Sequence, residues 1–250
     1  MTTALVIGGT GLVGSHLVKQ LSLPNSAFSK VFLIARNASK LNLSDEASAK
    51  ITPIEVPDFD SVFGPSSDPG QILSKFESGP THAFCCLGTT RAKAGSAEAF
   101  RRVDYDYIYG FGQLCKQIQS KFDNSLESFS LVSSAGASSS SWFLYPRTKG
   151  QSEEIISTLL TPVIPRIHIL RPGMLKYPIG TDDSRQEKRF VEEVVIKMDP
   201  LLEWVGPGKY SINSDDVARA MIKLSTDKSL SKEATTIFEN KDLRDLTDNQ

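Results

Sequence analysis

No apolar run in the sequence reaches the length of about eighteen residues that a membrane-spanning helix requires. No basic segment followed by an apolar stretch precedes the first predicted strand, which begins at Ala4, so we expect no secretory signal. A cleavable targeting sequence is not expected either, because its removal would destroy that first strand. These absences argue against a membrane-spanning protein and against a secreted protein.

Charge bias and metal-ligand spacing are lacking as well. The formal net charge at pH 7 is -1 and the isoelectric point is about 6.3, so no broad charge attracts the chain to nucleic acid or to anionic lipid. The three histidines, His16, His82 and His168, are scattered, so no metal site is expected. Cys85 and Cys86 would point to opposite faces of a strand, so the three cysteines are predicted to be buried thiols in a reducing compartment.

What the sequence does contain is a glycine-rich turn near its start. The apolar run 4–7 predicts a buried strand, and the segment 16–21 has helical spacing. Between them lie two dinucleotide-binding spacings, G-x-G-x-x-G from Gly9, Gly11 and Gly14, and G-x-x-G-x-x-G from Gly8, Gly11 and Gly14. A strand, a glycine turn and a helix can hold a dinucleotide pyrophosphate, because backbone N–H groups approach the phosphates at a positive helix N-terminus. A plain turn between strand and helix is the alternative.

Strand-like and helix-like segments alternate along the chain. Strands are predicted at 4–7, 30–35, 50–56, 82–87, 128–132, 166–170 and 235–239, and helices at 16–21, 95–120, 152–160, 186–198 and 214–225. This alternation predicts an α/β fold, a doubly wound parallel sheet of the Rossmann type. No linker or repeat divides the chain, so residues 1–250 are predicted to form a single NAD(P)-binding domain with a small substrate-side C-terminal region. A loop with a brief helix at 64–79 and a frayed acidic tail after Lys241 complete this prediction.

The end of the second predicted strand indicates which nucleotide binds. In dinucleotide folds a carboxylate at this point accepts a hydrogen bond from the ribose 2′-hydroxyl of NAD, whereas an arginine accommodates the 2′-phosphate of NADP. Here the strand ends in Arg36-Asn37, with Ser39 and Lys40 just beyond, and the first carboxylate is Asp45. We therefore expect NADPH as the cofactor. A solvated arginine at a strand end is the alternative.

Tyr145 and Lys149 form the candidate catalytic pair. They stand four apart at the start of a predicted helix, so they share one helix face. A tyrosine phenol titrates at about pH 10, and a nearby lysine cation favours the phenolate and brings proton transfer closer to neutral pH. The preceding strand ends in Ser133-Ser134, and a serine hydroxyl there can hold a substrate carbonyl against the tyrosine. A packed tyrosine ring beside a lysine stem is the alternative.

This combination resembles the short-chain dehydrogenase/reductase superfamily over almost the whole chain. Three stretches are similar in detail to an atypical branch, the Tat-interacting-protein oxidoreductase-like family, which includes fungal proteins attached to the mitochondrial outer membrane. They are 84–95 (FCCLGTTRAKAG), 131–137 (LVSSAGA) and 170–173 (LRPG). These stretches are far more specific than the glycine turn.

The resemblance implies a set of cofactor contacts. The pyrophosphate loop comprises Gly8, Thr10, Gly11, Leu12, Val13 and Gly14. The contacts further along comprise Leu87, Gly88, Thr89, Val103, Lys149, Leu170, Arg171 and, on the substrate-side loop, Arg185. Arg36 matches the arginine that binds the 2′-phosphate. The animal relative has two arginines after its second strand where this chain has Arg36-Asn37, and Lys40 can replace the missing one.

The resemblance also implies that Tyr145 and Lys149 are catalytic, together with one serine of the pair that follows the fifth strand. Ser134 is preferred to Ser133, because the second serine of such pairs usually takes this place in the superfamily. We therefore predict an NADPH-dependent oxidoreductase of the carbonyl-reductase type. In this interpretation Tyr145 supplies a proton, Lys149 holds the nicotinamide ribose and tunes the phenol, and Ser134 orients the oxygen of an unidentified small-molecule carbonyl.

Two alternatives stay open at this point. One is an NADPH-binding regulatory or redox-sensing protein with little or no turnover. The other is a nucleotide-sugar epimerase or dehydratase, which is less favoured because little chain remains after the sixth strand. The segment 176–190, with Arg185, Lys188 and Arg189, indicates either an anionic or polar substrate group or a solvated loop. We expect a cytoplasmic protein, and the fungal relatives imply peripheral association with the cytosolic face of the mitochondrial outer membrane.

Overall fold

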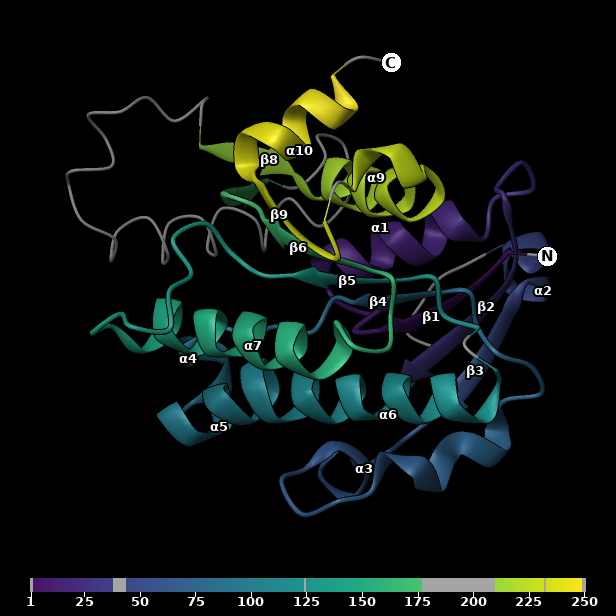
Figure 1. The fold of residues 1–250 in the computed structure, drawn as a ribbon, viewed down its shortest axis with the longest axis horizontal. Coiled ribbons are helices and arrows are strands. Elements are labelled where there is room, and N and C mark those ends of the chain that lie inside the picture. The colour runs from purple at the N-terminus through teal and green to yellow at the C-terminus, as the bar shows by residue number, and fades with distance from the viewer. Residues whose placement is uncertain (1, 38–43, 124, 177–209, 232, 249–250) are drawn as a thin grey trace.

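The computed structural model describes residues 2–37, 44–123, 125–176, 210–231 and 233–248. Its centre is a parallel sheet of seven strands in the order β3-β2-β1-β4-β5-β6-β9 (Figure 1). These strands are β1 (Thr2–Ile7), β2 (Phe28–Ala35), β3 (Ile51–Glu55), β4 (His82–Cys85), β5 (Ser128–Val132), β6 (Arg166–Arg171) and β9 (Thr235–Glu239). A separate two-stranded sheet pairs β7 (Met174–Lys176) with β8 (Ser211–Asn213).

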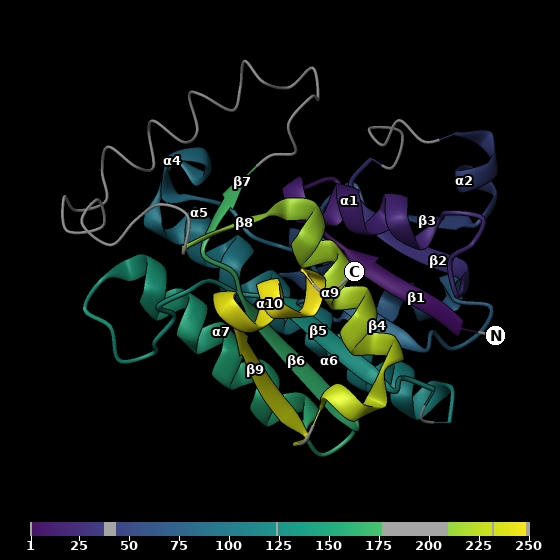
Figure 2. The ribbon, with the colours of Figure 1, turned by 90° about the horizontal axis from the view of Figure 1, so that it is seen from above.

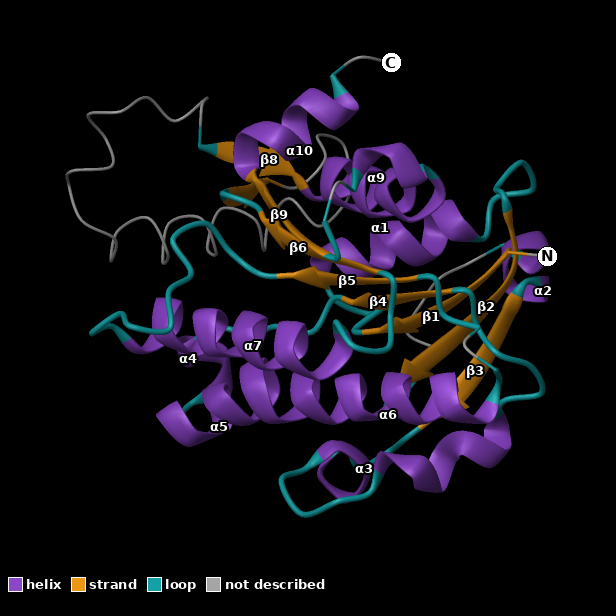
Figure 3. Cartoon of the chain, viewed as in Figure 1, coloured by secondary structure: helices purple, strands orange, loops and turns teal. Residues whose placement is uncertain are grey.

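Helices cover both faces of the sheet, as the purple and orange elements of Figure 3 show. One face carries α1 (Leu12–Leu21), α9 (Ser214–Thr226) and α10 (Asn240–Thr247), and the other carries α5 (Ala97–Arg101), α6 (Tyr107–Lys121) and α7 (Leu144–Leu160). The shorter helical segments are α2 (Asp45–Ala49), α3 (Asp60–Phe63), α4 (Arg91–Ala94) and the 3₁₀ segments Pro69–Lys75 and Lys228–Leu230. Figure 2 shows α1 and α9 side by side, and Gln20 of α1 donates to the carbonyl of Asp215 over 3.2 Å.

The sheet is apolar on both faces because it is covered on both. On β1, Leu5 and Ile7 pack into the core under α6 and α7, whereas Ala4 and Val6 pack into the core under α1 and α9. All four side chains are fully buried. The run 4–7 of β1 is therefore continuously apolar, and this is why the sequence predicts that strand well.

The pairing of β1 with β4 joins distant parts of the chain at the middle of the sheet. Its register places Ala4 opposite His82 and Ile7 opposite Cys85. At the start of this pair Thr3 receives and donates hydrogen bonds with Thr81, which lies 78 positions further along the chain. The carboxyl ends of β1 and β4 therefore lie next to each other.

A row of buried polar groups crosses β4, β5 and β6. Hydrogen bonds join His82 to Ser128 over 2.8 Å, Ser130 to His168 over 3.1 Å, and His168 to Ser231 over 2.8 Å. Burial lowers the pKa of His82 to about 4 and that of His168 to about 3, with the charge of Arg166 as a second cause. Among the residues that the structure describes, no group of three histidine, cysteine or acidic side chains could hold a metal ion.

The predicted fold class is confirmed: the chain forms a doubly wound parallel sheet in a single domain. Two details of the prediction are wrong. The segment after Lys241 is not frayed, because α10 begins with a capping box between Glu239 and Asp242 and buries Leu243. Cys86 is only partly buried, unlike Cys85 and Cys115.

The long helix predicted at 95–120 is divided in the structure. A π turn (Arg102–Asp106) separates α5 from α6. The short pair β7 and β8 was not predicted from the sequence. The helix predicted at 186–198, Ser39, Lys40 and the substrate-side residues Arg185, Lys188 and Arg189 lie outside the described residues.

Candidate active site

The glycine turn after β1 is closed tightly against the end of β4. Gly8 has a φ of +79°, a conformation that favours glycine, and its carbonyl accepts a hydrogen bond from the Gly11 N–H over 3.0 Å. A Cβ atom on Gly8 would lie 2.5 Å from the carbonyl carbon of Cys86, and one on Gly14 would overlap the Gly8 carbonyl. Neither Gly8 nor Gly14 can therefore be replaced by a residue with a side chain unless the backbone shifts.

Helix α1 begins directly at this turn, and no side chain caps it. Its N-cap residue is Gly11, which offers no hydrogen-bond acceptor from a side chain. The first N–H groups of a helix have no partner within the helix, and with its partial positive charge this end of α1 can bind an anionic group. Thr10 is exposed and Leu12 is half-buried, whereas the Val13 side chain packs into the core, so Val13 offers only its backbone to a ligand.

The two glycine spacings have different physical roles. A Cβ on Gly9 would lie 2.5 Å from the Leu33 side chain and 3.0 Å from that of Val18, so Gly9 allows α1 to pack closely on β2. Gly8, Gly11 and Gly14 shape the turn itself. The spacing G-x-x-G-x-x-G thus describes the turn, and Gly9 serves the packing behind it.

Arg36 directly follows β2. One neighbour of β2 in the sheet is β1, which leads into the glycine turn. It is exposed, and its guanidinium lies 5.9 Å from the centre of the Phe59 ring. The Phe59 side chain is itself buried. Arg36 therefore places a cation at the carboxyl edge of the sheet, where the first two strands end.

The residues after β4 contact a buried ion pair, which Asp104 forms with Lys149. Leu87 is buried, Gly88 is exposed and Thr89 is half-buried. The Thr89 N–H donates to the Asp104 carboxylate over 2.8 Å. A Cβ atom on Gly88 would lie only 3.2 Å from the Lys149 ammonium, so the chain passes the end of that side chain closely. Val103, which is half-buried, precedes Asp104 in the π turn.

Lys149 is buried and paired with Asp104. Its ammonium lies 2.7 Å from a carboxylate oxygen of Asp104, and the two side chains are 6% and 0% exposed. Burial by itself lowers the pKa of Lys149, but the charges of Asp104 and then Tyr145 outweigh it, so the pKa of Lys149 is raised above its ordinary value. The ion pair with Asp104 therefore favours the ammonium form of Lys149.

Tyr145 lies one turn before Lys149 at the start of α7. Its side chain is 42% exposed, and its ring stacks on Phe100 with a centroid distance of 5.7 Å and an interplanar angle of 28°. The stacking orients the ring, and the side chain remains partly exposed. A phenol next to a fixed ammonium is an arrangement that can transfer a proton.

The two serines after β5 differ in their surroundings. The Ser133 hydroxyl donates to the carboxylate of Glu153, and its N–H donates to the Leu170 carbonyl over 2.7 Å. The Ser134 hydroxyl is buried and has no hydrogen-bond partner among the described residues. Buried hydroxyl groups normally have a partner, so Ser134 has hydrogen-bonding capacity that the described residues leave unused.

Two of the predicted cofactor contacts have side chains engaged elsewhere. Leu170 is fully buried in the core under α9. The Arg171 guanidinium donates two hydrogen bonds to Glu153, of 3.0 and 2.6 Å, and one of 2.9 Å to Glu239. These bonds raise the pKa of Arg171 above its ordinary value. Either residue can therefore meet a ligand only through its backbone, and Arg185 lies outside the described residues.

Sequence reasoning missed Asp104 and Glu153. Asp104 is buried and follows Phe100 by four residues in the predicted helix 95–120, so it shares the helix face of that buried ring. A charged residue on that face was the available signal, because an acidic side chain is almost never fully buried without a partner. Glu153 follows Lys149 by four residues and shares its face, which is the same kind of signal.

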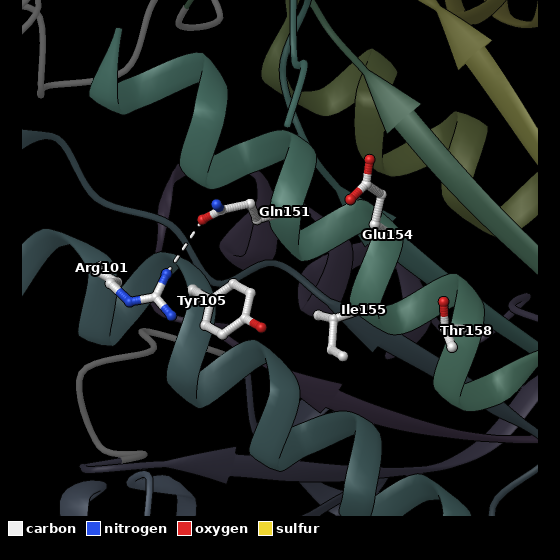
Figure 4. A pocket seen from close by; sticks show the side chains of 6 residues that line it. All are labelled: Arg101, Tyr105, Gln151, Glu154, Ile155 and Thr158. Carbon is white, nitrogen blue, oxygen red and sulfur yellow. Dashed lines mark hydrogen bonds between the residues drawn. The ribbon is translucent and has the colours of Figure 1, made fainter. Parts of the chain in front are cut away.

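A surface cavity of about 300 Å³ lies apart from this constellation, between the π turn and α7 (Figure 4). In it the Arg101 guanidinium lies 4.1 Å from the centre of the Tyr105 ring and donates to Gln151 over 3.2 Å. The other lining residues are Glu154, Ile155 and Thr158. None of the predicted site residues lines this cavity.

Comparison with curated proteins identifies relatives of similar length. The chain is 33% identical over 224 residues to "Protein FMP52, mitochondrial" of Lodderomyces elongisporus, covering 88% of this chain and 85% of that protein. It is 34% identical over 220 residues to "Protein HTATIP2" of Rattus norvegicus, covering 88% and 79%. No family model matches the chain.

Solved structures share the fold at low sequence identity. A short-chain dehydrogenase/reductase oxidoreductase from Burkholderia thailandensis has a TM-score of 0.62 at 16% identity, covering 97% of this chain and 92% of its own. The enzyme WbmF of Bordetella bronchiseptica, solved in complex with NAD+, has a TM-score of 0.64 at 16% identity, covering 100% and 79%. Both likenesses establish the Rossmann-type architecture of the short-chain dehydrogenase/reductase enzymes.

Proposed function

The chain belongs to the family of the FMP52 and HTATIP2 proteins, and from this premise we propose that it is an NADPH-dependent oxidoreductase that reduces a small carbonyl compound. The observation that supports the proposal is the buried Lys149 ammonium, paired with Asp104, with Tyr145 one turn earlier on the same helix. The Ser134 hydroxyl, just after the end of β5, is the third group of the proposed site. Ligands of open α/β sheets bind at the carboxyl edge of the sheet.

The residues present fit a dinucleotide. The glycine turn leads directly into the N-terminus of α1, whose N-cap residue Gly11 is exposed and has no side chain, so backbone N–H groups can approach an anion there. These groups would hold the pyrophosphate, and Arg36 would pair with the 2′-phosphate. The Lys149 ammonium, beside Gly88, would hold the nicotinamide ribose.

When bound, NADPH would supply the hydride that reduces the carbonyl carbon. Tyr145 donates the phenol proton to the carbonyl oxygen, so a ketone or an aldehyde leaves as an alcohol. Lys149 stabilises the phenolate that remains until solvent returns the proton. Ser134 donates a hydrogen bond to the same oxygen and holds it against the phenol, which completes the orientation of the substrate.

The test is multiple turnover of NADPH by the purified full chain against a panel of aldehydes and ketones. We expect consumption of many equivalents of NADPH, with one alcohol formed for each. Tight binding without consumption across the panel would reject the reductase and leave the alternative, an NADPH-binding regulatory or redox-sensing protein. A cofactor that stays bound and unchanged through turnover of a nucleotide sugar would indicate an epimerase or dehydratase.

We also propose that the protein associates peripherally with the cytosolic face of the mitochondrial outer membrane. The relatives named FMP52 are described as mitochondrial. Within the part of the chain that the structure describes, no helix is long and apolar enough to cross a bilayer. Trp142 and Phe143, which precede α7, are 94% and 78% exposed and are side-chain types that partition to a membrane interface.

A further inference from the structure

Asp104 occupies an unusual place for a carboxylate. It is fully buried, and it lies within the π turn that interrupts the helical segment between α5 and α6. Single π turns inside helices occur frequently at functional sites. An unpaired charge at such a position would cost several kcal/mol, so the partners of Asp104 determine whether the turn can exist.

Those partners come from two other elements. One carboxylate oxygen lies 2.7 Å from the Lys149 ammonium of α7, and the other accepts the Thr89 N–H of the loop after β4 over 2.8 Å. The backbone carbonyl of Asp104 accepts a hydrogen bond from the Ser152 hydroxyl, also of α7. One residue thus connects the π turn, the loop after β4 and the helix that carries the catalytic pair.

The surroundings of Lys149 show what the carboxylate contributes. The groups that act on its charge are Asp104 in the π turn, Tyr145 on α7 itself and Cys85 on β4. Burial raises the pKa of the Cys85 thiol to about 12, so this thiol is uncharged near neutral pH. Tyr145 is a neutral phenol at the start of the proposed reaction. Asp104 is therefore the group that supplies a negative charge to Lys149 throughout.

We propose that Asp104 is the positioning residue of the site: its carboxylate keeps the Lys149 side chain charged and fixes the ammonium beside Gly88 and Thr89, where the proposed cofactor would pass. Without Asp104 the burial of Lys149 favours the neutral amine, which can neither stabilise a phenolate nor bind a ribose as a cation. The charge of Lys149 is a property of the free protein. Only its use toward NADPH rests on the proposed function.

The first test measures the charge of Lys149 directly and without cofactor. Lysine labelled at the ε-carbon with ¹³C reports its protonation by NMR, and Lys149→Arg identifies the Lys149 signal. In the natural protein we expect this signal to stay in the ammonium form beyond the pH at which exposed lysines titrate, about 10.4. In Asp104→Asn we expect it to titrate at least about two pH units lower, because burial then acts unopposed.

Ser152→Ala is the matched control, because it removes a hydrogen bond to the same residue but leaves the carboxylate in place. It should lower stability and leave the Lys149 titration unchanged. If Asp104→Asn does not fold, the natural protein still decides the matter: a Lys149 signal that titrates below the exposed lysines overturns the proposal. An Asp104→Asn protein with an unshifted Lys149 signal overturns it equally.

The second test follows binding of NADP+ by calorimetry at about pH 6.5 and about pH 9. In Asp104→Asn the loss of affinity relative to the natural protein should be at least tenfold greater at the higher pH, where Lys149 is neutral. A residue with a merely structural role would weaken binding equally at both. If the natural protein does not bind NADP+ at all, the proposed function fails, while the NMR titration still decides the role of Asp104.

Discussion

The Ser133 hydroxyl donates to the carboxylate of Glu153, and this hydrogen bond distinguishes two neighbouring serines that are otherwise equivalent in sequence. Glu153 is buried and also receives two hydrogen bonds from Arg171, so Ser133 belongs to a closed ionic cluster. Ser134 has no such partner among the described residues. The two hydroxyl groups therefore serve different purposes.

The first prediction separates these serines. Ser134→Ala should lower kcat by roughly 10²–10³, the cost of removing one hydrogen-bond donor to a reacting oxygen, with stability unchanged. Ser133→Ala leaves Glu153 short of a donor and should cost about 1–3 kcal/mol of unfolding free energy, with kcat retained. Steady-state kinetics and denaturant unfolding of both variants test this. The reverse assignment of effects would make Ser133 the active serine.

The second prediction concerns the proton donor. Tyr145→Phe keeps the ring that stacks on Phe100, so the fold and NADPH affinity should survive while turnover falls by roughly 10²–10⁴. Lys149→Ala should reduce both turnover and NADPH affinity, because one ammonium serves the phenol and the ribose. Tyr105→Phe, in the separate cavity, is the matched control and should be neutral. Turnover at the natural rate in Tyr145→Phe would eliminate the phenol as proton donor.

The third prediction concerns cofactor choice. Arg36 stands exposed at the end of β2, so we expect NADPH to bind at least about tenfold more tightly than NADH, or about 1.4 kcal/mol. Arg36→Ala should remove most of this preference and change NADH binding little. Arg219→Ala, which removes an exposed arginine of α9, controls for the loss of one positive charge. Equal affinities of the natural protein in calorimetric titration would contradict the NADPH assignment.

The fourth prediction is a loss of stability in mild acid. His82 and His168 are buried as neutral rings, with pKa values of about 4 and about 3 in the folded protein and about 6.5 when unfolded. Below about pH 6.5 the unfolded chain binds protons that the folded chain does not, so stability falls as the pH falls toward the folded pKa values. Between about pH 7.5 and 5 the loss should be about 2 kcal/mol for each histidine.

Denaturant unfolding at both pH values measures this loss. His16, half-buried on α1, also has a pKa lowered by burial and acts in the same direction. The variants His82→Gln and His168→Gln are expected to be less stable than the natural protein at pH 7.5 but to show a smaller drop on acidification. A free energy of unfolding that stays level across this range would show that the rings accept protons without leaving their hydrogen bonds.

The fifth prediction concerns location. Carbonate extraction of a mitochondrial fraction should release the protein, as expected for peripheral association. Replacing the exposed aromatic pair by Trp142→Ser and Phe143→Ser should reduce the fraction that sediments with mitochondria before extraction. The matched control Tyr210→Ser replaces an exposed aromatic residue elsewhere on the surface. Retention of the natural protein in the carbonate pellet would indicate an anchor rather than a peripheral contact.

The sequence predicts well those elements whose residue pattern within a short stretch of chain already determines their structure. The run 4–7 is apolar because β1 is covered on both faces. Gly14 has its steric reason within the turn, because a Cβ there would overlap the Gly8 carbonyl, whereas Gly8 is restricted by Cys86, far along the chain. Helix α10 was missed because it depends on a reciprocal cap between Glu239 and Asp242 and on burial of a single leucine. Its composition alone resembles that of a disordered tail.

The part of the site that the sequence does not predict is made of partners far apart in the chain. Asp104 meets Lys149 and Thr89, and Glu153 meets Arg171 and Ser133, across three or more elements. Spacing rules relate residues within one helix or strand and contain no information on such pairs. The spacing of Tyr145 and Lys149 on one helix, together with the family resemblance, predicted that pair. The partners of the buried carboxylates Asp104 and Glu153 emerge only once the fold brings the elements together.

The pairing of β1 with β4 also bears on the speed of folding. Neighbours in this pair, Thr3 and Thr81, are 78 positions apart, and closing so long a loop costs chain entropy before any contact is gained. Folding rates fall as such distant pairings increase. The glycine turn rests on Cys86 at the end of β4, so it acquires its shape only after this closure. The glycine turn, although it stands first in the sequence, is therefore expected to mature late in refolding, after its own strand and helix have formed.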